Sequence, residues 1–337
     1  MNRLAVFPVV LAVFSTLLPR PAEGAALAAL ANVTTNNDKQ AGQVTIGTGA
    51  VAVIAGSTPL AGAGSNSQNT AYDSGGNRLF TYDAIGNTLY TINMATGAAT
   101  NATLGGAAIS GVTDLEYDEV EGVLYAIVNI GADRQLATIG IGTGIVALPG
   151  SPIAGASLST FSQPFDLDAA NNRYYFVGAP AAGNTLYAIN TANGAVATSA
   201  LVTGPGSLTN VMGLEYDSVE AVMYALAGVT GGDRQLATVN ITPGPGFGTV
   251  TLMGSPIAGE SLGTSGNEAL DPTGDRYYFT GAQASDGGNG RLYAINTTNG
   301  AVADTDLLTF GAGINDVRGL EFDIDTLPVE LLEVEVD

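Results

Sequence analysis

Three glutamates and one aspartate occupy equivalent positions from which carboxylates can act together. Glu116, Glu215 and Glu321 each stand two residues before an aspartate, in the segments LEYD, LEYD and LEFD, and Asp166 holds the same place in DLD. Carboxylates that converge repel one another, and a hard cation with oxygen ligands relieves that repulsion. We therefore predict that these four side chains bind a calcium or magnesium ion.

Two other arrangements stay open for the same carboxylates. Each carboxylate could pair with an arginine from a neighbouring repeat, or it could contact water in a channel. Raised pKa values would also lower the repulsion, because a protonated carboxyl group carries no charge. We predict the metal site as one alternative and name no catalytic residue.

The absence of histidine and cysteine excludes much enzyme chemistry. The chain of 337 residues has neither, and Lys39 is its lone lysine. Thiol nucleophiles, disulfides, imidazole or thiolate zinc sites and histidine-dependent triads are thereby excluded. The formal net charge of −21 argues against a nucleic-acid partner, since phosphate neutralisation needs clustered Lys and Arg.

Internal repeats determine which elements position the carboxylates. DRQLAT occurs twice, LYAIN twice and GSPIAG twice, each with a weaker third copy, and each long period splits into two units of about 50 residues. Every unit contains a strand that ends in aspartate, at Asp73, Asp118, Asp168, Asp217, Asp271 and Asp323. We expect these aspartates to accept backbone N–H bonds in the following turn.

Each unit reads as four short antiparallel strands. In one unit they are MGLEYD, VMYALAG, RQLATVNI and GTVTLMG, separated by turns rich in Gly, Asp, Pro and Asn. Such a sheet cannot cover both of its faces, so the sequence predicts an all-β six-bladed propeller. Five units are complete, and residues 29–55 together with residues 316–323 supply the sixth blade. This closure is one C-terminal strand plus three N-terminal strands, or two plus two if the tail contributes.

The two ends have compositions of their own. Residues 1–24 resemble a signal peptide, with a basic start, an apolar run and small residues before the cleavage point. We expect residues 25–325 to form the propeller, and no segment of the mature chain to span a membrane. Residues 326–337 form an acidic tail or an extra strand, through which the protein could associate with itself. The predicted location is extracellular or periplasmic, with the cell surface as a further alternative.

The repeats resemble those of known propellers. LYAINTANGAVA at Leu186, LYAINTTNGAVA at Leu292 and LDPTGDRYYFTG at Leu270 are similar to repeats of secreted bacterial propellers of the YVTN, NHL and PQQ-like groups. That resemblance implies the fold, and the group includes binding scaffolds as well as lactonases, lyases and dehydrogenases. The quinone-dependent members keep tryptophan in their blades, whereas this chain has none.

These observations favour an exported, non-enzymatic binding module. Its face loops would contact a protein or carbohydrate ligand. One alternative is a calcium-assisted hydrolase or lyase with its site at the central channel. The other is a self-associating cell-surface or filament protein.

Overall fold

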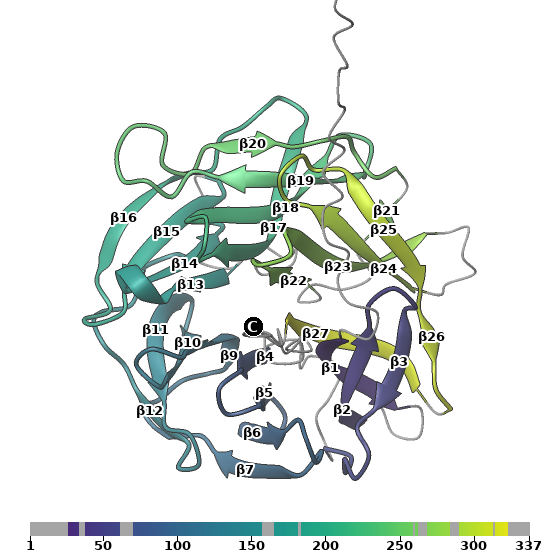
Figure 1. The fold of residues 1–337 in the computed structure, drawn as a ribbon. Helices are drawn as coiled ribbons and strands as arrows, with labels where there is room; N and C mark the ends of the chain where they lie inside the picture. The colour runs from purple at the N-terminus through teal and green to yellow at the C-terminus, as the bar shows by residue number, and fades with distance from the viewer. Residues whose placement is uncertain are drawn as a thin grey trace, which may run out of the picture.

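The computed structural model is a ring of six β-sheets arranged around a central axis (Figure 1). It describes residues 26–33, 38–60, 70–156, 165–180, 183–258, 260–261, 268–283, 290–312 and 314–322. The six-bladed propeller expected from the repeats is thus confirmed. The predicted signal peptide and the tail at 326–337 lie outside the described residues. The described part contains no helix long and apolar enough to cross a membrane.

Five blades are continuous in sequence, and in each the first strand is innermost. Blade 1 comprises β4 (Thr70–Asp73), β5 (Arg78–Asp83), β6 (Thr88–Asn93) and β7 (Ala99–Thr103). Blade 2 comprises β9 (Val112–Asp118), β10 (Val123–Ile130), β11 (Asp133–Ile139) and β12 (Ile145–Ala147). Blade 3 comprises β13 (Phe165–Asp168), β14 (Arg173–Gly178), β15 (Thr185–Asn190) and β16 (Val196–Leu201), with a short 3-10 helix at Ala169–Asn171.

The other two continuous blades repeat this order. Blade 4 comprises β17 (Leu208–Asp217), β18 (Val222–Val229), β19 (Arg234–Val239) and β20 (Val250–Leu252). Blade 5 comprises β22 (Glu268–Asp271), β23 (Arg276–Gln283), β24 (Gly290–Asn296) and β25 (Val302–Leu307). An additional short strand, β21 (Glu260–Ser261), pairs with β23.

The sixth sheet, which we call the closing blade, joins both ends of the described chain. Its innermost strand is the C-terminal β27 (Ile314–Phe322), which pairs antiparallel with β1 (Ala26–Val33). Outward from β1 follow β2 (Asp38–Thr45) and β3 (Ala50–Val53). Closure is therefore one C-terminal strand plus three N-terminal strands, which decides between the two arrangements that the sequence allowed.

Extra strands cover the outer edges of alternate blades. β26 (Thr309–Phe310) runs parallel to β3, and β8 (Gly105–Gly106) runs parallel to β12. A parallel bridge between Thr203 and Thr249 lies at the corresponding place on blade 4. Each segment follows the last strand of the preceding blade, so the connection itself pairs with an edge that would otherwise present bare N–H and C=O groups.

The core lies between the blades. The described buried side chains form six apolar clusters, each drawn from two neighbouring blades. The cluster between blade 5 and the closing blade, for example, joins Tyr278 and Leu292 to Leu27 and Leu320. Because apolar burial scales with the area removed from water, every blade depends on both neighbours for its stability.

Aspartates end the inner strands as predicted. Asp118 Oδ1 accepts the N–H groups of Val120 and Glu121 at 2.9 Å, and Asp217 makes the equivalent pair of bonds. Asp73, Asp168 and Asp271 also accept turn N–H groups. Asp323 lies outside the described residues. The turn-making role is confirmed for the five described aspartates.

Candidate functional site

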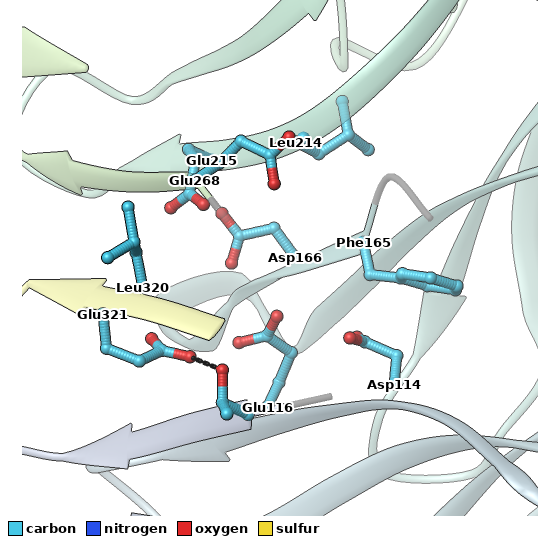
Figure 2. Close-up of a pocket in the computed structure, with 11 residues that line it drawn as sticks. Asp114, Glu116, Phe165, Asp166, Leu214, Glu215, Glu268, Leu320 and Glu321 are labelled. Carbon is cyan, nitrogen blue, oxygen red and sulfur yellow. Dashed lines mark hydrogen bonds between the residues drawn. The ribbon is translucent and has the colours of Figure 1, made fainter. Parts of the chain in front are cut away.

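The inner strands bring the four predicted carboxylates to one level of the channel. Glu116 is paired in register with Tyr125, and Glu215 with Tyr224. Asp166 and Glu321 occupy the same register position in blade 3 and the closing blade, opposite Tyr175 and Ala28. All four line a single cavity of about 70 Å³. Figure 2 shows them pointing toward one another from different blades.

Two further carboxylates, which sequence reasoning missed, also line this cavity. Asp114 lies two residues before Glu116 on β9, and alternate residues of a strand point to the same face. That spacing is a signal that could have identified Asp114. Glu268 is the first residue of β22 and stands three residues before Asp271, the aspartate that ends its strand. The four predicted carboxylates stand two residues before theirs, so the repeat alignment does not select Glu268.

A glycine lets Glu268 reach the cavity. Gly213 on β17 has φ +49°, and a Cβ atom built there would lie 2.5 Å from both Glu268 Cγ and Tyr277 Oη. The register of β17 against β18 shifts at this residue, as in a β-bulge. The Tyr277 hydroxyl donates to the Gly213 carbonyl oxygen at 2.6 Å. The missing side chain therefore makes room for a contact between blades 4 and 5.

Hydrogen-bond donors from neighbouring blades hold several carboxylates. Thr70 Oγ1 of blade 1 donates to Glu321 Oε1 of the closing blade at 2.7 Å, the bond drawn dashed in Figure 2. The Tyr174 hydroxyl of blade 3 donates to Asp114 Oδ2 of blade 2. Asp166 accepts the Leu167 N–H at 2.5 Å and also the Tyr216 N–H of blade 4. The bonds to Glu321 and Asp114, and the bond from Tyr216 to Asp166, each join two neighbouring blades.

No lysine or arginine is among the described residues that line the cavity. Arg78 is paired with Asp73, and Arg318 Nε lies 2.6 Å from Asp316 Oδ2. Those two arginines are thus engaged with carboxylates that do not line the cavity, and hydroxyl and backbone donors hold Glu321, Asp114 and Asp166.

Burial raises the pKa values of the cavity carboxyl groups. The pKa values of Asp166 and Glu321 rise to about 7, mainly because protein atoms replace water around them. Burial raises the pKa values of Asp114, Glu116 and Glu215 well above their usual range, and repulsion from the neighbouring carboxylates adds to the effect. The cluster therefore retains protons near neutral pH.

The arrangement does not form a ready metal site. Among the described residues, no group of three or more Asp or Glu side chains is placed so that it could hold a metal ion. The calcium or magnesium prediction for Glu116, Glu215, Glu321 and Asp166 stays a prediction. What the geometry supports chemically is proton binding, and attraction of cations when the carboxyl groups ionise.

A larger cleft lies between blades 2 and 3. It has a volume of about 530 Å³, and its lining residues are Glu121, Val123, Tyr125, Thr138, Ala147, Leu148, Pro149, Thr191 and Ala192. The Tyr125 hydroxyl donates to Glu121 Oε2 at 3.0 Å, which positions an exposed carboxylate at the cleft. The same bond recurs in blade 4 between Tyr224 and Glu220. Sequence reasoning did not identify this cleft, because it forms between two blades from residues that are far apart in the sequence.

Comparison with known proteins shows the fold alone. No family model matches the chain, and no curated protein matches it in sequence. TolB from Acinetobacter baumannii is similar with a TM-score of 0.59 and 13% identity, over 91% of this chain and 68% of that chain. A chain of a nidogen–laminin complex has a TM-score of 0.59 and 8% identity, over 88% of this chain and 97% of that chain.

A quinone-containing propeller is also similar in fold. The PQQ-bound aldose sugar dehydrogenase from Streptomyces coelicolor has a TM-score of 0.50 and 15% identity, over 72% of this chain and 80% of that chain. The chain is thus a six-bladed β-propeller structurally similar to TolB and PQQ-type propellers at low identity. At such identities the similarity shows architecture and carries no activity across.

Proposed function

We propose that this chain is an exported, non-enzymatic binding module that holds its ligand in the cleft between blades 2 and 3. The observation that carries the proposal is the volume of that cleft, about 530 Å³. Pockets for small molecules or ligand segments measure about 300–1,000 Å³. The channel cavity of about 70 Å³ is far below that range and has room for only a few water molecules or an ion.

The lining of the cleft suits a ligand with both apolar and hydroxyl groups. Val123, Leu148 and Pro149 supply apolar surface, while Thr138 and Glu121 supply polar groups at its margin. A carbohydrate or an extended peptide presents this mixture. A chain of similar fold occurs in a structure of a nidogen–laminin complex, so the architecture is compatible with a protein partner.

A panel of soluble oligosaccharides and short peptides tests this proposal by thermal melting, since a ligand that binds only the folded state raises the midpoint. We expect one of these two classes to raise it, and Ala192→Trp to abolish the rise by filling the cleft. Thr298→Trp is the matched control, because Thr298 is the exposed counterpart of Ala192 in the blade 5 turn. Equal responses in both variants would contradict binding in the cleft.

Cation binding in the channel is a second candidate. It is favoured by the convergence of six carboxylates on one cavity with no basic side chain among its described lining residues. Glu116, Glu215, Glu321 and Asp166 would supply the oxygen ligands after side-chain rotation. The small cavity argues for a bound ion without a substrate, and hence against the calcium-assisted hydrolase or lyase.

Calcium titration distinguishes this candidate from the first. At pH 8 we expect saturating calcium to raise the midpoint of the wild-type protein relative to EDTA, and to do so less in Glu215→Gln. Glu220→Gln, which changes an exposed turn glutamate, is the control. Identical midpoints of the wild type in calcium and EDTA would eliminate the calcium site and leave the cleft proposal untouched.

A further inference from the structure

Lys39 is buried in a way that ordinary packing does not explain. It is the lone lysine of the chain, and its exposed fraction is 0%. Its Nζ atom makes no hydrogen bond with any described residue. A buried ammonium without partners is strongly disfavoured, so proteins rarely leave one in that state. A chemical explanation for this side chain is therefore needed.

A row of three polar residues crosses the closing blade at Lys39. Asn32 on β1 is directly opposite Lys39 on β2, and Asp316 on β27 is directly opposite Asn32. Residues opposite each other in antiparallel strands point to the same face, with Cβ atoms about 4.5–5.5 Å apart. The face is the one packed against blade 1, where Leu30 and Ala41 are fully buried.

Asn32 is also buried and incompletely bonded. Its exposed fraction is 9%, and its Oδ1 atom has no hydrogen-bond donor among the described residues. An amine and an amide thus lie side by side without bonding to each other. Buried polar groups in proteins normally have hydrogen-bond partners, so two adjacent groups without them need an explanation. A covalent bond between the two side chains would supply one.

The repeats supply an internal comparison. In blade 2 the equivalent pair is Arg134 opposite Asn129, and Asn129 Oδ1 likewise has no described donor. A guanidinium stays protonated and does not act as a nucleophile, whereas an amine can lose its proton when buried. The closing blade alone among the described blades combines a primary amine with an opposing asparagine.

The surroundings favour the reactive form of the amine. Burial lowers the pKa of Lys39, and Arg318 acts in the same direction, while Asp316 opposes them. Asp316 accepts the Val317 N–H at 2.9 Å and is paired with Arg318, so a carboxylate is held at the end of the row. An amine whose charged form burial disfavours, an amide carbonyl carbon and a partly exposed carboxylate that can carry a proton therefore share one face of the closing blade.

We propose that Lys39 and Asn32 form an intramolecular amide bond once the closing blade has folded. The lone pair of Lys39 Nζ attacks Asn32 Cγ and forms the new C–N bond. The bond from Cγ to Nδ2 then breaks, and Nδ2 leaves as ammonia. The Asp316 carboxylate takes a proton from Nζ and passes it to Nδ2, so the reaction needs no oxidant and no co-reactant. The product is a neutral amide, which removes the unpaired buried ammonium.

Two measurements on the denatured wild-type chain test the bond. Its intact mass should be lower by one ammonia molecule than the sequence-derived mass from its determined N-terminus. A protease specific for lysine should leave the chain uncut, because Lys39 is its one possible cleavage site and an acylated lysine is not cleaved. A full mass together with cleavage at Lys39 overturns the proposal, whatever the variants do.

The variants assign the reacting groups. Lys39→Arg, which installs the residue of blade 2, and Asn32→Ala should each show the full mass, and Asn32→Ala should be cut at Lys39. Asn129→Ala is the matched control and should keep the loss of ammonia. If Lys39→Arg still lost the mass of ammonia, the loss would arise elsewhere in the chain, and the proposed bond would be overturned.

The role of Asp316 needs its own variant. Asp316→Asn, checked for folding by circular dichroism, should slow or prevent the reaction. Unchanged cross-linking in this variant would show that Asp316 takes no part in it.

Discussion

At the scale of single residues, the channel carboxyl groups should limit stability in a pH-dependent way. Burial and neighbouring carboxylates raise the pKa of Glu215, so ionising it in the folded protein is costly. Glu215→Gln removes that cost. We expect the variant to melt about 2 °C or more above the wild type at pH 8, and to match the wild type near pH 4. Thermal melting at both pH values measures the difference.

The control for this prediction is Glu220→Gln on the blade 4 turn. Glu220 is exposed, and its Oε2 accepts the Tyr224 hydroxyl at 3.0 Å, a bond that an amide oxygen can replace. Both substitutions remove one ionisable carboxyl group from an acidic chain. If Glu220→Gln stabilised the protein as much as Glu215→Gln, the gain would come from net charge and not from the channel.

At the scale of elements, the bulge in β17 should depend on glycine. Gly213→Ala places a Cβ 2.5 Å from Glu268 Cγ and Tyr277 Oη, at a positive φ that L-residues disfavour. We expect a loss of about 2 kcal/mol or more in the free energy of unfolding, measured by urea denaturation. Gly47→Ala is the control, because Gly47 has φ +84° and nothing within 4 Å of the added Cβ. Equal losses would mean that φ alone, and not the contact between blades 4 and 5, accounts for the cost.

The sequence predicts those elements and site residues that are marked by a pattern within a single strand or turn. Strand ends marked by aspartate, such as Asp118 and Asp217, recur at a fixed spacing, so blades and their inner strands could be identified from the sequence. Glu116 and Glu215 follow from that alignment. Glu268 does not, since its approach depends on a bulge at Gly213 in another blade. Packing between distant strands, like the cleft beside Tyr125, has no local sequence signal.

At the scale of the whole molecule, stability should fall as pH rises from about 4 to 8. The pKa values of Asp166 and Glu321 rise to about 7 in the folded protein, from about 4 in an unfolded chain. The folded state therefore binds protons more tightly than the unfolded state between these values, and its advantage is lost as pH passes through about 7. Thermal melting across this range in high salt, which screens exposed charges, checks the slope. A midpoint that rises with pH would contradict it.

Ring closure should make folding of the six blades depend on β27. Val317 and Leu320 of this strand are buried in the cluster shared with blade 5, and Glu321 accepts the Thr70 hydroxyl of blade 1. A chain truncated after residue 308 loses β26 and β27, so the closing blade has no inner strand and two interfaces lose contacts. We expect it to lose the cooperative melting transition, whereas truncation after residue 325 should keep it, because the described closing blade ends at Phe322. Calorimetry of both chains provides the measurement, and a cooperative transition in the shorter chain would show that closure is dispensable for the ring.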